Sequence, residues 1–447
     1  MNQLLAFERA LNGYVWGGPM IVLLVGTGIL LTVLTGFVQF RRLGTSLREV
    51  LGQVFAGGRG AGSVTPFQAV ATALASTVGV GNIAGVATAI AIGGPGALFW
   101  LWISGILGMC TKYAEIVIAF EYREPDESGT MRGGAMYSLK KGLGLRWLGS
   151  IFALLTAVAA FGIGNMVQAN SVAGALSESF SVSPAATGIA LAALTAVVII
   201  GGIKRIGEFT SVLVPFMAAL YLIGGFVVLV LHASQLPDAL RLVFDGAFNG
   251  TAAVGGFTGS TVMLALRFGI ARGLFSNEAG LGSAPMVHAA AQTDHPVRQG
   301  LYGIFEVFVD TLLICSMTGL VLLVTGAWTS GLDGAALSAR AFQVGLPGAW
   351  GHIVVTGGIL LFSFSTLVGW SYYGETGIVY LLGARAAVPY RLLWIVFIYL
   401  GATGSLQVVW GVADTLNGLM AVPNLVALLA SIPLLLRLQR EFFAAAR

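Results

Sequence analysis

The chain has 447 residues, of which 57% are hydrophobic and only 9% are Asp, Glu, Lys or Arg. Soluble domains carry roughly a quarter charged residues, so a mean hydropathy of +0.88 excludes a soluble globular protein. At about 20 residues per transmembrane helix, this composition predicts one all-α polytopic membrane protein with on the order of ten to twelve spans.

The cysteine count and the net charge exclude further classes. Cys110 and Cys315 both lie in apolar runs, which excludes a disulfide scaffold or a zinc cluster. The net charge is +4, but the basic residues lie in short connections between apolar runs, a pattern that reflects membrane topology and not nucleic-acid binding. The first apolar run is too long for a cleavable signal and ends at Arg41 and Arg42.

Apolar runs separated by charged or Pro/Gly-rich breaks predict eleven spans. We place them at 14–40, 66–92, 96–121, 147–176, 185–203, 209–233, 256–288, 297–327, 349–381, 389–409 and 412–438. With the N-terminus outside, the cytoplasmic segments hold 17 Lys and Arg residues and the outer segments hold 3. The positive-inside rule therefore predicts an outside N-terminus and a cytoplasmic C-terminus.

Two of these spans carry dense Gly, Ser, Thr and Asn near their middle, and both should break there. The second contains the stretch 75–85 and the seventh the stretch 272–282. Residues 82–89 also align with residues 277–284, sharing Asn, Ala, Gly and Ala at the same offsets. Because the predicted topology runs the two spans in opposite directions, the match predicts an inverted repeat of five helices plus five.

The repeat divides the chain into three parts. Residues 1–64 form an N-terminal helix and a cytoplasmic connection, residues 65–233 the first five-helix repeat, and residues 251–440 the second. Non-helical backbone at membrane depth must line a cavity or be buried in protein. The free N–H groups of a half-helix attract a carboxylate, while unwound carbonyls coordinate a cation, so a zwitterionic amino acid with Na⁺ fits these breaks.

Several long motifs resemble the alanine or glycine:cation symporter family. The longest runs from Gly94 to Glu115 (GPGALFWLWISGILGMCTKYAE), and the others cover 81–89, 161–170, 275–283 and 369–375. The resemblance extends over most of residues 14–440. It implies a leucine-transporter-like fold and Na⁺-coupled uptake of small neutral amino acids, mainly alanine and glycine, across a prokaryotic inner membrane. Two departures are Val80 and Ser365, where relatives often carry Thr, and they leave substrate preference and coupling strength open.

The resemblance and the breaks together predict two sets of site residues. The substrate is expected to contact residues of the second, fourth, seventh and ninth spans: Ser76, Thr77, Gly79, Gly81, Asn82, Asn165, Gln168, Gly273, Phe275, Ser276, Asn277 and Trp370. By the superfamily pattern, the cation is expected at the carbonyls of Ala75 and Val78 and the hydroxyls of Ser365 and Thr366. Each assignment competes with a structural interpretation as small or polar residues for helix packing.

Ionisable residues inside spans are functional candidates because they are costly there. We expect Lys112 to pair with Glu115, which is three residues later, and Glu278 to pair with Arg272 or Arg267. Glu306 and Asp310 are four residues apart on one predicted helix face, where two ionised carboxylates would repel. His288 and His295 are expected in a cytoplasmic connection.

Three other functions compete with sodium symport. An enzyme is disfavoured because metalloprotease, serine-hydrolase and dinucleotide motifs are missing from the sequence. A passive channel would show a ring-forming filter or one polar stripe, and not two related broken helices. A proton-coupled amino acid transporter of the same fold stays open. The expected partners are the amino acid and membrane lipid, without nucleic acid, and the oligomeric state is not predicted.

Overall fold

The computed structural model describes residues 10–54, 57–404 and 407–445. After a helical segment at residues 10–15, the α-helices follow in chain order. They are α2 (Gly18–Leu34), α3 (Val38–Arg41), α4 (Leu43–Gly52), α5 (Pro66–Thr77), α6 (Val86–Gly93), α7 (Gly96–Glu121), α8 (Ala135–Tyr137), α9 (Arg146–Ala160), α10 (Val167–Phe180), α11 (Pro184–Ile199), α12 (Gly202–Leu231), α13 (Leu236–Asn249), α14 (Val262–Asn277), α15 (Pro285–His288), α16 (Pro296–Val307), α17 (Ser316–Val324), α18 (Gly334–Gly345), α19 (Trp350–Leu382), α20 (Ala387–Thr403), α21 (Gln407–Ala430) and α22 (Ile432–Ala445).

Short segments of other geometry connect or interrupt these helices. Four are π-helical: η1 (Gly81–Gly85), η2 (Ser138–Gly142), η3 (Phe161–Met166) and η5 (Phe308–Cys315). Three are 3₁₀ turns: η4 (Ala233–Gln235), η6 (Ala327–Thr329) and η7 (Ala384–Ala386). Strands β1 (Glu124–Pro125) and β2 (Met131–Arg132) form an antiparallel hairpin after α7, with Glu124 opposite Arg132.

The all-α membrane architecture is confirmed. In the described part of the chain, eight helices are long and apolar enough to cross a membrane, and the bent pair formed by residues 66–77 and 81–93 brings the total to nine. The 16-residue α11 and the broken α14–α15 unit occupy the two remaining predicted intervals. The prediction missed α13 and α18, because both lie in connections and their apolar residues follow one face instead of forming a run.

The second span breaks where the Gly-rich sequence predicted. Thr65 begins α5 with a capping box, in which its hydroxyl accepts from the Gln68 amide N–H, and the helix ends at Thr77. Val78 is extended, with φ −79° and ψ 92°, and the chain bends by 52° before the helix resumes at Gly81. Since an extended residue interrupts the i to i+4 ladder, carbonyl groups at the end of α5 lose their helical partners.

The seventh span also breaks, but in a different way. Helix α14 ends at Asn277, and Glu278 adopts a left-handed conformation with φ 56°, which is uncommon for a residue with a side chain. The chain is then non-helical until α15, which is a single turn. Strained backbone of this kind persists only where the surroundings hold it, and it gathers at functional sites.

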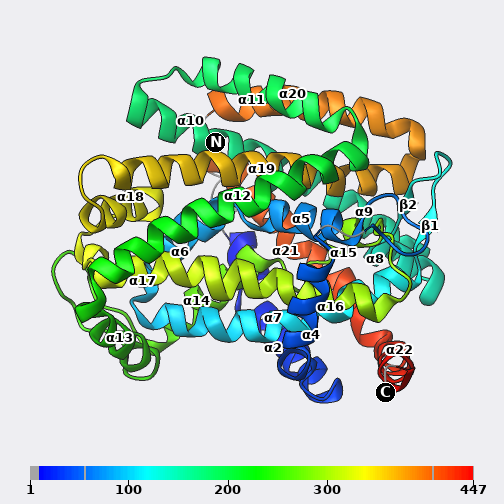
Figure 1. Cartoon of the computed structure of the whole chain (residues 1–447), viewed down its shortest axis with the longest axis horizontal. Helices are drawn as coiled ribbons and strands as arrows, with labels where there is room; N and C mark the ends of the chain where they lie inside the picture. The colour runs from blue at the N-terminus through cyan, green and yellow to red at the C-terminus, as the bar shows by residue number, and fades with distance from the viewer. Residues whose placement is uncertain (1–9, 55–56, 405–406, 446–447) are drawn as a thin grey trace.

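The helices sort by burial into a protein core and a lipid-facing shell. Helices α14 and α16 pack against α7, and α5 packs against α12 and α19 (Figure 1). Most residues of α7 and α19 are buried, so these two helices belong to the core, whereas most residues of α12 are not buried. Helices α11 and α20 lie side by side at the upper edge of the same view. On α12, Val212 is 73% and Ile223 is 63% exposed. Such an apolar surface fits the hydrocarbon core of a membrane, in agreement with the all-α membrane architecture.

Candidate functional site

Oxygen atoms from the second and ninth spans converge beside the break after α5. The Ser365 hydroxyl lies 3.1 Å from the Ala75 carbonyl oxygen and 3.4 Å from that of Val78. The Thr366 hydroxyl lies 3.2 and 3.5 Å from the same two oxygens. Both hydroxyls also donate to the Phe362 carbonyl, at 2.8 and 2.9 Å. The four predicted cation ligands are therefore brought together, with Phe362 O as a fifth nearby oxygen.

The chemistry of this oxygen cluster follows from the end of α5. The last carbonyls of a helix have no intrahelical partner and carry the negative end of the helix dipole. Here they face two hydroxyls, so all five groups are neutral hard oxygen donors, and all their residues are buried. Such a set of ligands fits a small hard cation and not a transition metal, which prefers thiolate or imidazole ligands.

A small cavity lies on the other side of the same break. Its volume is about 90 Å³, well below the roughly 300–1,000 Å³ of sites for drug-sized ligands. The walls come from the second, fourth and seventh spans: Val80, Gly81, Ala84, Gly85, Thr88, Val167, Gln168, Arg272 and Phe275. A cavity of this size suits a ligand of a few heavy atoms.

Gln168 gives this cavity an unsatisfied polar group. Its amide nitrogen donates to the Ile163 carbonyl at 3.1 Å, but its buried Oε1 has no hydrogen-bond partner in the described structure. A methyl group added at Gly79 would lie 2.8 Å from Thr366 Oγ1 and 3.5 Å from Gln168 Oε1. Gly79 thus separates the oxygen cluster from the cavity, and it has no room for a side chain.

A wider cavity of about 540 Å³ approaches the small one from one end of the protein. The two cavities share Val80 and Ala84 as wall residues. The wider cavity lies between α10, α18 and α19, and its charged wall residues are Glu178 and Arg340. We refer to it below as the vestibule.

Asp310 ties the two broken spans together. Its carboxylate accepts from Asn82 Nδ2 at 2.6 Å, from the Ser276 hydroxyl at 2.9 Å and from the Thr311 hydroxyl at 2.8 Å. The Asn82 side-chain oxygen in turn accepts from the Gly79 N–H at 2.9 Å. Because a buried carboxylate is costly without such donors, these bonds hold both breaks in one arrangement.

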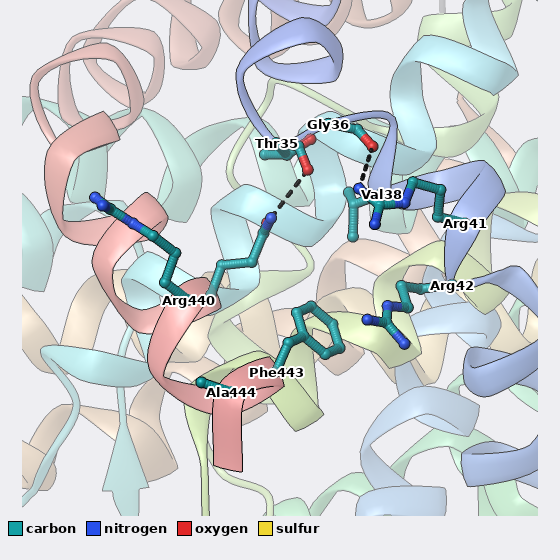
Figure 2. A pocket seen from close by; sticks show the side chains of 9 residues that line it. Thr35, Gly36, Val38, Arg41, Arg42, Arg440, Phe443 and Ala444 are labelled. Atoms are coloured by element: carbon teal, nitrogen blue, oxygen red, sulfur yellow. Dashed lines mark hydrogen bonds between the residues drawn. The ribbon is translucent and has the colours of Figure 1, made fainter. Parts of the chain in front are cut away.

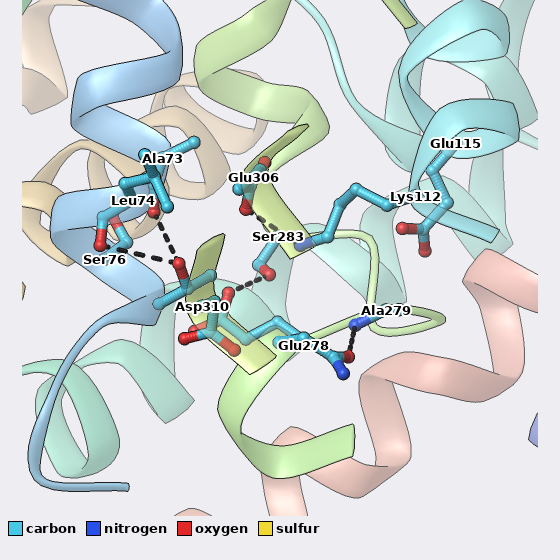
Figure 3. A network of polar contacts seen from close by, with 12 residues as sticks. Ala73, Leu74, Ser76, Lys112, Glu115, Glu278, Ala279, Ser283, Glu306 and Asp310 are labelled. Carbon is cyan, nitrogen blue, oxygen red and sulfur yellow. Dashed lines mark hydrogen bonds and ion pairs between the residues drawn. The ribbon is translucent and has the colours of Figure 1, made fainter. Parts of the chain in front are cut away.

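A second buried network surrounds the loop that follows α14 (Figure 3). Lys112 forms an ion pair with Glu306 at 3.2 Å, and His288 lies 3.1 Å from the other Glu306 oxygen. Glu115 accepts the backbone N–H groups of Gly280 and Gly282 at 3.0 and 3.1 Å. The shape of the loop therefore depends on Glu115 of α7, and Glu306 of α16 holds Lys112 and His288 beside it.

Comparisons with known proteins identify the family of this chain. The sequence pattern described as the sodium:alanine symporter family matches residues 1–447. The chain belongs to the sodium:alanine symporter family. A relative named sodium/alanine symporter AgcS, from Methanococcus maripaludis, is 48% identical over 429 residues, covering 94% of this chain and 93% of that protein. A Bacillus subtilis relative named putative sodium/proton-dependent alanine carrier protein YrbD is 36% identical, covering 97% and 91%.

Solved structures agree on the fold of this symporter. The crystal structure of MhsT in complex with L-phenylalanine superposes with a TM-score of 0.58 at 13% identity, covering 85% of this chain and 98% of that one. At this identity the likeness concerns the fold alone. It confirms the predicted leucine-transporter-like architecture, and the family membership excludes an enzyme.

The symporter brings only some of the predicted substrate residues to the small cavity. Gly81, Gln168 and Phe275 line it, and Gly79 lies at its edge. Asn82 and Ser276 instead bind Asp310, one layer behind the cavity.

Other predicted substrate residues face helix neighbours. The Ser76 and Thr77 hydroxyls donate back to Thr72 and Ala73 of their own helix, at 3.0 and 3.2 Å. Gly273 packs against α7, where an added methyl group would overlap the Ser104 hydroxyl. For these three residues the contacts correspond to the packing interpretation.

The remaining three residues support neighbouring segments. Asn165 donates to the Trp394 carbonyl at 2.8 Å, while its own Oδ1 is buried without a partner in the described structure. Asn277 binds Thr311 and the Ala279 N–H. Trp370 donates to Glu278 Oε1 at 2.9 Å and packs on Gly164, so it contacts the loop and not the small cavity.

The pairing predicted for the ionisable residues is wrong. Lys112 pairs with Glu306 and not with Glu115, since the partner comes from a neighbouring span. Glu278 accepts from Trp370 and Ser283, and not from Arg272 or Arg267, because its left-handed backbone turns it into the protein.

Glu306 and Asp310 were also expected to face each other and repel, but they do not share a set of partners. The π-helical segment η5 begins between them, and each carboxylate has its own donors. His288, predicted in a cytoplasmic connection, is fully buried against Glu306. Sequence spacing alone misses such cases, because it assumes 3.6 residues per turn and an aqueous loop.

Sequence reasoning missed two features of the candidate site. Arg272 lies on the wall of the small cavity, although its sequence position suggested only an ion pair. The vestibule depends on α18, a helix that hydropathy did not predict. The one sequence signal for the role of Arg272 in the cavity wall was its charge inside a predicted span.

Proposed function

We propose that this symporter imports a small neutral amino acid, alanine or glycine, together with Na⁺. The observation that carries the proposal is the pairing of a five-oxygen cluster with a cavity of about 90 Å³ on either side of one helix break. The family and the names of its sodium and alanine relatives support the same substrates.

The proposed Na⁺ site consists of the carbonyls of Ala75, Val78 and Phe362 and the hydroxyls of Ser365 and Thr366. Each hydroxyl now donates to the carbonyls around it. With a cation at the centre, the hydroxyl protons would turn away and five oxygen lone pairs would face the ion. The dipole of α5 points its negative end at this position, which favours a positive charge without a carboxylate.

The proposed amino acid site is the small cavity. The unpartnered Gln168 Oε1 requires a donor, and an amino acid ammonium group supplies one. The helix that resumes at Gly81 presents its N-terminus at the break, where free backbone N–H groups favour a carboxylate. Phe275, on the opposite wall, limits the side chain to one or two carbons.

Access to the site is proposed to alternate between the two ends of the protein. One end is open through the vestibule, which shares Val80 and Ala84 with the small cavity. At the other end, ion pairs join Arg132 to Asp126 at 2.7 Å and to Glu375 at 2.8 Å, and Arg391 to Glu375 at 2.6 Å. Breaking that group would open the second end.

The distribution of Lys and Arg assigns these ends. It favours a vestibule facing outward and the ion pairs facing the cytoplasm, with the N-terminus outside the inner membrane of a prokaryotic cell. In the same scheme, residues 65–233 and 251–440 are the two inverted repeats, and residues 1–64 pack outside them.

Proton coupling is the second candidate, and two observations favour it. Asp310, Glu306, Glu278 and Glu115 are all buried close to the breaks, and one relative bears the name sodium/proton-dependent carrier. In this version a buried carboxylate takes up the proton as the substrate binds.

The deciding experiment is alanine uptake into proteoliposomes under one imposed gradient at a time. Concentrative uptake driven by a Na⁺ gradient at equal pH on both sides is the expected result. Uptake driven only by a proton gradient would reject the five-oxygen site as the coupling site and favour the buried carboxylates. Competition of labelled L-alanine uptake by glycine, D-alanine and L-leucine tests the size limit set by Phe275.

A further inference from the structure

A basic cleft lies between the segment that follows the first membrane helix and the C-terminal helix α22, and it shares no residue with the candidate transport site. Its volume is about 500 Å³. The walls are formed by the turn after α2, by α3 and by α22: Thr35, Gly36, Val38, Arg41, Arg42, Gln439, Arg440, Phe443 and Ala444 (Figure 2). The cleft thus has three arginines on its walls and no acidic residue among them.

The arginines are not neutralised by the protein. In the part of the chain that the structure describes, no ion pair joins Arg41, Arg42 or Arg440 to a carboxylate, whereas nearby Arg437 pairs with Glu441 at 3.9 Å and Arg298 with Glu49 at 2.8 Å. Uncompensated guanidinium groups in one cleft attract an anion.

Two of the guanidinium groups are held in place. Arg42 lies over the Phe443 ring, 4.0 Å from its centroid, and Figure 2 shows the two side chains together. Arg41 donates one hydrogen bond, from Nη1 to the Gly36 carbonyl oxygen at 3.4 Å. A guanidinium has five N–H donors, so most of them are left for a ligand, and paired donors match a phosphate in the bidentate mode. Arg440 lies on the α22 wall, with its side chain directed away from Arg41 and Arg42 in Figure 2.

The cleft is built on a fixed frame. Gln439 of α22 donates to the Thr35 carbonyl at 2.9 Å and accepts from the Tyr113 hydroxyl at 3.2 Å. This pair of bonds ties the last helix to the end of α2 and to α7. The two walls of the cleft therefore keep their spacing without a ligand.

The surroundings of the cleft are those of a membrane interface. Phe37 and Phe40, next to its wall, are 48% and 55% exposed, and the neighbouring Val33 and Leu34 of α2 are exposed as well. Exposed Phe, Val and Leu side chains at the end of a span fit contact with lipid, and the exposed apolar face of α2 continues from them along the span. A ligand bound here would have its anionic part at the arginines and its apolar part along α2.

We propose that this cleft binds the phosphodiester headgroup of an anionic membrane lipid. Basic pockets between transmembrane helices are known to suit such headgroups, and the combination of Arg41, Arg42 and Phe443 with a lipid-facing apolar wall favours a lipid over free phosphate. The lipid would bridge the first helix, which lies outside the repeat, to the last one.

The test is native mass spectrometry of the full chain in detergent, titrated with phosphatidylglycerol or with phosphatidylcholine of the same acyl chains. The Arg41→Gln/Arg42→Gln variant should bind phosphatidylglycerol with roughly tenfold lower affinity than the unaltered protein does. Its affinity for phosphatidylcholine should be unchanged. The matched control is Arg48→Gln/Arg437→Gln, which removes the same charge from exposed helix positions outside the cleft and should retain the lipid.

A second variant covers the case that the double substitution does not fold. Ala444→Glu adds a carboxylate to the exposed wall of the cleft and leaves every arginine contact intact, so it should also reduce phosphatidylglycerol binding. The proposal would be overturned if Ala444→Glu bound phosphatidylglycerol as well as the unaltered protein does. It would also be overturned if the control variant lost as much phosphatidylglycerol binding as the Arg41→Gln/Arg42→Gln variant. Displacement of the lipid by inorganic phosphate at the same concentration would identify a free-anion site and reject the lipid assignment.

Discussion

The oxygen cluster gives the sharpest test, which is the replacement of Thr366 by valine. Valine keeps the branched shape of threonine but exchanges the hydroxyl for a methyl group. The lost oxygen is the one that lies 3.2 Å from Ala75 O and 3.5 Å from Val78 O. Leaving buried polar groups without a partner costs about 1–3 kcal/mol. If Thr366 binds Na⁺, its loss therefore raises the Na⁺ concentration for half-maximal uptake by about 5- to 150-fold.

The assay is the Na⁺ dependence of alanine uptake into proteoliposomes at saturating alanine. Thr366→Ser keeps the hydroxyl and should remain close to the unaltered protein. Thr325→Val is the matched control, because that hydroxyl bonds only to carbonyls of its own helix, at 2.7 and 3.3 Å. An unchanged Na⁺ dependence in Thr366→Val, with Thr325→Val also unchanged, would refute the assigned cation site.

Linkage adds a second readout to the same variant. If Na⁺ raises the affinity for alanine, alanine must raise the affinity for Na⁺ by the same factor. Thr366→Val should therefore weaken alanine binding at a fixed Na⁺ concentration and have little effect at saturating Na⁺. A loss of alanine affinity that persists at saturating Na⁺ would mean that the hydroxyl serves the amino acid site.

Three further predictions follow from the cavity and from the β1–β2 hairpin. Gly79→Ala should abolish Na⁺-driven uptake, because its methyl group would lie 2.8 Å from Thr366 Oγ1, whereas Gly357→Ala, with open space around it, should transport normally. Gln168→Leu should raise the KM for both alanine and glycine by about 5- to 150-fold, from the same cost of about 1–3 kcal/mol; an effect on alanine alone would indicate side-chain packing. Although partial burial raises the pKa of Asp126, hydrogen bonds from Ser128 and Arg132 outweigh it and hold that pKa below its usual 3.8. The ionised carboxylate therefore stabilises the hairpin above the usual pKa, and this contribution is lost as the pH falls through the lower folded value. The difference in unfolding temperature between the unaltered protein and Asp126→Asn should be present at pH 6 and shrink below about pH 4; a difference independent of pH would contradict it.

Hydropathy predicted the membrane spans well, because a continuous apolar run has no stable alternative to a helix in lipid. The same signal could not find α13 and α18, whose apolar residues serve one face only. The Gly- and Asn-rich stretches correctly located both breaks, since glycine weakens a helix and asparagine competes for its backbone bonds. Their geometry was not predictable: one break is an extended residue at Val78, and the other is a left-handed Glu278.

The residues of the candidate cation site, two with backbone carbonyls and two with short hydroxyl side chains, were predicted best. Ala75, Val78, Ser365 and Thr366 come together as expected. Side-chain partners were predicted poorly, because the alternatives for a buried Lys or Glu lie on other spans and their register depends on π-helical segments such as η5. One inserted residue rotates the following helix by about 100°, which moves a side chain to another neighbour.

One helix break supplies both halves of the proposed transport site. The carbonyls that end α5 face the oxygen cluster, and the N-terminus of the helix that resumes at Gly81 faces the cavity. Asn82 fixes the distance between them by accepting from the Gly79 N–H, and its own nitrogen is fixed by Asp310. A cation that orders Val78 therefore also orders the amides three residues later. Because Ser276 of the opposite break binds the same Asp310 carboxylate, ordering one broken span constrains the other, which is the physical requirement for an ion and an amino acid to bind as a pair.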